Sequence, residues 1–125
     1  MTAPFLSAII SFRYPIMEKL IERGLLYDSY GGLLNEKNKR IYEACAVDDM
    51  SLSEIAEEIG ISRQAVSETL NRTDIRLRRY EEELGLIAKR KQILTLLDEM
   101  RSVLDAKSVD KKRLKAIADS IEEVI

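Results

Sequence analysis

The segment Ser51–Arg72, SLSEIAEEIGISRQAVSETLNR, constrains the fold of this chain more than any other segment. Ser51 is a favourable helix N-cap, and Glu54 follows it at the spacing of a capping box. Gly60 can end that helix in a left-handed conformation, and Ser62 can cap a second helix directly afterwards. Two short helices joined by so tight a turn predict a helix-turn-helix.

The periodicity of the two helices separates a buried face from an outward face. The predicted core of the motif is Ile55, Ile59, Val66 and Leu70. Outward polar side chains on the second helix could pair with base edges, and arginines on its flank could hold phosphates. The predicted nucleic-acid interface is therefore Arg63, Gln64, Ser67, Asn71, Arg72, Arg76 and Arg79.

The charge of the chain limits how strongly such an interface can bind. The formal net charge is −2, so no global basic field attracts nucleic acid. Between Ser51 and Arg79, five acids (Glu54, Glu57, Glu58, Glu68 and Asp74) balance five arginines. We therefore expect weak, salt-sensitive binding by one subunit and stronger binding by a dimer. The alternative, in which the same polar face docks on a protein, stays open.

The composition favours an all-α fold and gives no support to catalysis. The chain has 125 residues, of which 46% are hydrophobic, with two prolines and no tryptophan. It has no histidine, and no nucleophile–base pair or phosphate loop is visible, so we expect no enzyme activity, metal or cofactor. The single Cys45 favours a cytoplasmic protein, and no apolar run approaches the roughly 18 residues of a membrane span.

Residues 1–16 differ in character from the rest of the chain. They are apolar, carry one charge (Arg13) and contain both prolines. Three interpretations stay open: an arm packed on the domain, a tail that adsorbs to membranes, or an extension upstream of a natural start at Met17. We assign residues 1–16 to an N-terminal extension and residues 17–74 to the helix-turn-helix domain.

Residues 75–125 predict long helices with apolar stripes. The first stripe ends near Gly85, where we expect one bent helix or two helices that meet around residues 85–92. A last helix is expected from about Val109. These stripes exceed what a small helix-turn-helix core can cover, so they should pack on each other or on a second subunit. The predicted homodimer interface is Ile93, Leu97, Met100, Leu104, Leu114, Ile117 and Ile121.

Tyr30–Thr73 resembles the YlxM-like helix-turn-helix proteins of Firmicutes and mollicutes, and Leu77–Leu86 resembles their next helix. The most telling part is Ile61–Val66, ISRQAV. The family is also similar to region 4 of bacterial sigma factors, and its members start near Met17. Its members tend to carry Lys where Asn71 stands and Tyr where Ser67 stands, so this chain has a less positive second helix.

That family is typically encoded beside the signal recognition particle GTPase. The resemblance therefore implies a cytoplasmic, non-enzymatic regulator or accessory of the particle's targeting pathway. The partners it implies are the particle's small RNA and its GTPase. Two alternatives stay open: a helical interaction module that docks on the GTPase without nucleic acid, and a sigma-like DNA-binding transcription regulator. The sequence does not decide whether RNA, DNA or protein is the partner.

Overall fold

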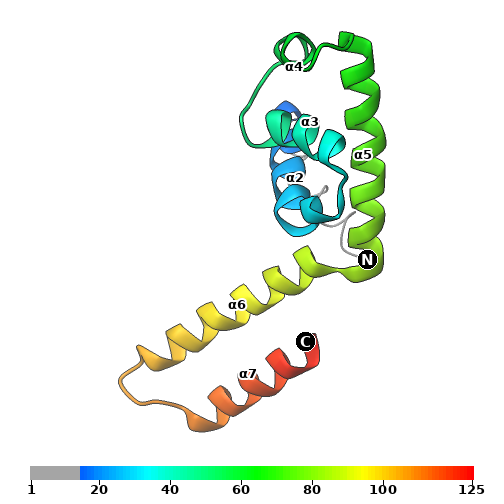
Figure 1. The fold of residues 1–125 in the computed structure, drawn as a ribbon. Coiled ribbons are helices and arrows are strands. Elements are labelled where there is room, and N and C mark those ends of the chain that lie inside the picture. Colours follow the sequence, from blue (N-terminus) through cyan, green and yellow to red (C-terminus); the bar gives the residue numbers. More distant parts are fainter. Residues whose placement is uncertain (1–14) are drawn as a thin grey trace. The chain divides into compact units, whose positions relative to one another are not determined.

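The computed structural model describes residues 15–125, and within that range the chain is all-α, as expected (Figure 1). Its elements are α2 (Pro15–Tyr30), the 3-10 turn η1 (Gly31–Leu33), α3 (Glu36–Ala46), α4 (Leu52–Ile59), α5 (Arg63–Leu84), α6 (Leu86–Leu104) and α7 (Lys111–Val124). The interpretations of residues 1–16 fall outside the described residues, except that Pro15 and Ile16 belong to α2.

The predicted helix-turn-helix is formed by α4 and α5, and its ends are built as expected. Ser51 accepts a hydrogen bond from the Glu54 backbone N–H, and the Glu54 side chain accepts one from the Ser51 backbone N–H, which completes the capping box. Gly60 ends α4 with φ of 81°, in the left-handed region. Ser62 caps α5 by accepting from the Ala65 N–H.

The core of the motif follows the predicted apolar face. Ile55 and Val66 are fully buried and Leu70 is 1% exposed. Ile59 is only half-buried, because it lies in the last turn of α4. The small side chain of Ala56 is also buried, consistent with the close packing of α4 on α5.

Helices α2 and α3 complete the first compact unit by packing on each other and on α5. Figure 1 shows α4 beside the N-terminal end of α5 and the pair α2 and α3 beside its middle. The largest buried apolar side chains at these contacts are Tyr30, Ile41, Tyr42 and Leu77. Because α5 touches every other long helix of the unit, it is the element on which the unit is assembled.

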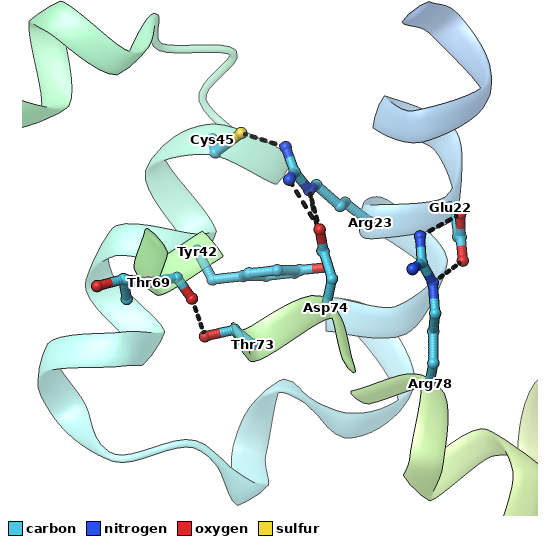
Figure 2. Close-up of polar contacts among 8 residues, drawn as sticks. All are labelled: Glu22, Arg23, Tyr42, Cys45, Thr69, Thr73, Asp74 and Arg78. Carbon is cyan, nitrogen blue, oxygen red and sulfur yellow. Dashed lines mark hydrogen bonds and ion pairs between the residues drawn. The ribbon is translucent and has the colours of Figure 1, made fainter. Parts of the chain in front are cut away.

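A buried polar network ties α2 and α3 to α5 (Figure 2). The Arg23 guanidinium donates to both carboxylate oxygens of Asp74, with N–O distances of 2.8–3.2 Å. The Tyr42 hydroxyl donates to the same carboxylate at 2.8 Å. Burial disfavours the charged guanidinium, but the hydrogen bonds and charge of Asp74 outweigh it and raise the pKa of Arg23. A charge pair this deeply buried is tolerable because its polar atoms are satisfied.

A second ion pair repeats the connection one turn further along α5. Arg78 donates to Glu22 through Nε at 2.6 Å and Nη2 at 3.2 Å. These hydrogen bonds are the largest cause of the raised pKa of Arg78. Consecutive residues of α2, Glu22 and Arg23, thus pair with residues four apart on α5, which fixes the register of the two helices.

The second compact unit is a hairpin of α6 and α7, which pack on each other after the turn at residues 105–110. Asp110 caps α7 by accepting from the Arg113 N–H, and the Arg113 guanidinium contacts Glu99 at 3.3 Å. Val103 and Ile117 are buried. Most of the predicted interface is half-buried, namely Ile93, Leu97, Met100, Leu114 and Ile121, while Leu104 is exposed.

The boundary between the two units lies at Gly85, beyond the residue 74 expected from the sequence. Helix α5 runs unbroken to Leu84, and Gly85 then adopts a left-handed conformation with φ of 63°. The expected break near residues 85–92 is therefore a junction between two helices, and residues 75–84 belong to the helix-turn-helix unit.

Candidate nucleic-acid interface

The first two turns of α5 place predicted interface residues at the surface. The tight turn at Gly60 and the Ser62 cap start the helix at Arg63, so its first outward side chains stand clear of α4. Arg63 and Gln64 are exposed, and Ser67 is half-buried. Gln64 donates to the Glu68 carboxylate across one turn at 3.3 Å, so one oxygen of this carboxylate already accepts a hydrogen bond.

The next turns add an amide and three arginines. Asn71, Arg72, Arg76 and Arg79 are all exposed. Arg76 is held along the helix, since its Nε donates to the Tyr80 hydroxyl at 2.8 Å and its guanidinium lies 5.8 Å from the Tyr80 ring centre. Six of the seven predicted residues are thus exposed along α5, and Ser67 is half-buried.

The structure changes the charge balance of this face. The count from Ser51 to Arg79 included Asp74 and Arg78, but Asp74 is buried against Arg23 and Arg78 is paired with Glu22. Four exposed arginines and Glu68 remain on α5 up to Arg79. The exposed acids Glu82 and Glu83 follow near the end of α5. On α4, the backbone hydrogen bond from Ser51 lowers the pKa of Glu54. The exposed surface of α5 from Arg63 to Arg79 is therefore positive, although the two-helix segment from Ser51 to Arg79 is neutral.

A cleft beside this face includes residues that the sequence did not point to. It measures about 280 Å³, and two of the predicted residues, Ser67 and Asn71, line it. Lys19 and Arg23 of α2 and Ser51 before α4 line it as well. No local sequence signal links Lys19 to α5, because the two meet only through the packing of α2 on α5.

Residues 15–125 contain no group of three or more Cys, Asp or Glu placed to hold a metal ion. None of the described helices is both long and apolar enough to cross a membrane.

The helix-turn-helix fold agrees with comparisons to known proteins. The family model UPF0122, described as "Putative helix-turn-helix protein, YlxM / p13 like", matches residues 17–119. The chain belongs to this family. A UPF0122 protein of Symbiobacterium thermophilum is 44% identical over 81 residues, covering 65% of this chain and 76% of the relative. UPF0122 proteins of Halalkalibacterium halodurans and Bacillus pumilus are 36% and 38% identical, each covering 86% of this chain and 97% of the relative.

The family match includes both structural units, since residues 17–119 extend from α2 into α7. The resemblance noted in the sequence is thereby confirmed, and the α6–α7 hairpin is part of the matched region.

Proposed function

We propose that this UPF0122 protein binds nucleic acid through the outward face of α5. The observation that supports this most is the positive face itself: four exposed arginines with Gln64, Ser67 and Asn71 between them. Arginine can pair with guanine or phosphate, and Gln and Asn can pair with adenine. Because α5 is fixed by two ion pairs to α2, these side chains are presented on a rigid helix.

We further propose that the protein acts in the cytoplasm as a non-enzymatic regulator or accessory of the signal recognition particle pathway. This part rests on the family resemblance, which implies the particle's RNA and GTPase as partners. The RNA is the preferred ligand of this proposal, and duplex DNA, bound as in a sigma-like regulator, is the competing ligand.

The test is a titration of the full chain with labelled signal recognition particle RNA and with labelled duplex DNA at two salt concentrations. Each phosphate contact contributes about −0.9 to the slope of log K against log salt on duplex DNA. About three contacts from the exposed arginines would therefore give a slope of about −3. Binding of one ligand with a steep salt dependence supports the proposal, whereas no binding to either ligand at low salt would refute it.

A second candidate is a module that docks on the targeting GTPase without nucleic acid. It is favoured by the polar contacts already made on the face, where Gln64 contacts Glu68 and Arg76 contacts Tyr80. A pull-down separates the two candidates. If Arg63→Ala with Arg72→Ala abolishes nucleic-acid binding but retains GTPase capture, α5 is the nucleic-acid interface and the GTPase docks elsewhere. GTPase capture by a wild type that binds no nucleic acid supports the docking module instead.

A further inference from the structure

The cleft beside α5 has a lining suited to an anion. It is bounded by α2, the end of α3, the start of α4 and the middle of α5, all within the first unit. Among the described residues that line it there is no carboxylate. The larger groove between α3 and α4, of about 650 Å³, differs in this respect, because four carboxylates line it together with three basic side chains.

The polar groups around the cleft are mostly hydrogen-bond donors. Lys19 supplies an exposed ammonium group with three donors. The Ser51 oxygen already accepts from Glu54, so its hydroxyl hydrogen can point outward. Ser67 and Asn71 add a hydroxyl and an amide from the interface helix. At the start of α4 the Glu54 N–H donates to Ser51 and the Glu54 carboxylate accepts from the Ser51 N–H, which leaves the N–H groups of Leu52 and Ser53 without an acceptor within the helix.

On the floor of the cleft, one N–H group of Arg23 is hydrogen-bonded to a weak acceptor. Figure 2 shows the Arg23 guanidinium between the Asp74 carboxylate and the Cys45 sulfur. Nε and Nη2 donate to Asp74, whereas among residues 15–125 the Nη1 group donates only to the Cys45 thiol, at 3.4 Å. A thiol is a poor acceptor, so a phosphate oxygen would satisfy this N–H better. Since Asp74 balances the charge of Arg23, the net charge of the cleft comes from Lys19.

We propose that this cleft is a phosphate-binding site and that, where the proposed function holds, it receives a backbone phosphate of the nucleic acid read by α5. Ser67 and Asn71 belong both to the cleft and to the interface, so one ligand could occupy the two together. The site would give the weakly charged α5 face an additional electrostatic contact. Because Lys19 comes from α2, a helix outside the helix-turn-helix, the nucleic-acid footprint would extend beyond the motif.

The first arm of the test uses nucleic acid and full-length Lys19 variants. Lys19→Gln should weaken binding several-fold and reduce the steepness of the salt dependence by about 0.9. Lys19→Arg should restore both, because a phosphate contact needs charge rather than one particular amine. Lys37→Gln is the matched control, since Lys37 is an exposed lysine of the other groove. If Lys19→Gln binds like the control, the backbone assignment is overturned.

The second arm uses inorganic phosphate and does not depend on nucleic-acid binding. Amide chemical shifts of the ¹⁵N-labelled protein are followed at constant ionic strength, and Cys45, Leu52, Ser67 and Asn71 should move together. Asn71→Asp, which places a carboxylate at the cleft, should suppress these shifts, whereas Gln64→Glu on the same helix should not.

The two arms distinguish the sources of the phosphate. Amide chemical-shift changes on adding phosphate, together with weaker nucleic-acid binding by Lys19→Gln, support a backbone phosphate. Chemical-shift changes without weaker nucleic-acid binding by Lys19→Gln support a free phosphate and overturn the assignment to a backbone phosphate. If phosphate causes no chemical-shift changes and Lys19→Gln binds nucleic acid normally, the proposed phosphate site is overturned. Failure of the wild type to bind any nucleic acid refutes the proposed function instead, and the phosphate arm then decides the cleft alone.

Discussion

At the scale of single residues, the informative surprise is the burial of Asp74. The sequence count treated Asp74 as one acid among five between Ser51 and Arg79, and the structure shows that it accepts hydrogen bonds from Arg23 and Tyr42 in the interior. Its main partner lies 51 residues away, so no local pattern could reveal the pairing. The apolar residues Ile55, Val66 and Leu70 were predictable, because helical periodicity depends only on near neighbours.

Tyr42 should make the stability of the protein sensitive to alkaline pH. Burial, and then the charge and hydrogen bond of Asp74, raise the pKa of Tyr42 above its ordinary value. The folded state therefore keeps a proton that the unfolded state loses above pH about 10. The stabilisation is complete below that pH and is lost as the pH rises towards the folded pKa, at up to about 1.4 kcal/mol per pH unit.

Tyr42→Phe removes this titration and the hydroxyl hydrogen bond together. At neutral pH it should lower the free energy of unfolding by about 1.5–3 kcal/mol, and that gap should narrow between pH 9 and 11. Tyr27, whose pKa is raised to about 12, is present in both proteins and so its contribution cancels. Denaturant melts at several pH values provide the measurement, and a gap that stays constant would contradict the assignment.

Leu70 should be among the most sensitive positions in the helix-turn-helix core. It is 1% exposed, so Leu70→Ala should lower the free energy of unfolding by about 2–5 kcal/mol in chemical denaturation. Ile75→Ala is the matched control on the same helix, because Ile75 is 58% exposed, and it should change stability by no more than about 0.5 kcal/mol. Equal effects at the two positions would be incompatible with the observed faces of α5.

At the scale of elements, helix ends were predicted well because capping is local chemistry. Ser51 and Ser62 cap the helices expected of them. The length of α5 in the first unit was harder to foresee, since its last turns are held by contacts such as Arg78 with Glu22. The cleft could not be predicted at all, because it exists only where α2, α4 and α5 come together.

Two glycines should respond in opposite directions to the same substitution. Gly60→Ala puts a side chain at φ of 81° and should cost about 1 kcal/mol, although the added methyl meets no neighbour. Gly24 lies inside α2, where an added Cβ also meets nothing within 4 Å. Gly24→Ala should therefore stabilise the protein by about 0.5–1 kcal/mol. Thermal melts of the two variants check this, and a shift of the same sign in both would contradict it.

At the scale of the whole molecule, the chain divides into a helix-turn-helix unit and a helical hairpin. Sequence periodicity predicted the apolar stripes of α6 and α7, but periodicity alone does not identify what covers them. Within the hairpin most of the stripe is only half-buried, and Leu94 and Leu104 are about half exposed. The homodimer predicted from the sequence would cover this surface.

Leu97→Glu tests that dimer. A charge placed among half-buried apolar side chains should weaken association, so the mass measured by light scattering should fall from dimer to monomer. Ser102→Glu is the matched control, because Ser102 is exposed on the same helix, and it should leave the mass unchanged. Lys91 does not suit this role, because it makes other contacts. A mass that Leu97→Glu does not alter would mean that the stripe is satisfied within one chain.

One titration series tests directly whether α5 carries the nucleic-acid contacts. The full chain with Arg63→Ala and Arg72→Ala is compared with Arg40→Ala and Arg101→Ala, a pair of exposed arginines on other helices that changes the net charge equally. The α5 pair should lower affinity at least about tenfold and reduce the salt slope by about 2, while the control pair stays near wild type. Equal losses of affinity in both double variants, or no loss in either, would contradict the assignment of the nucleic-acid contacts to α5.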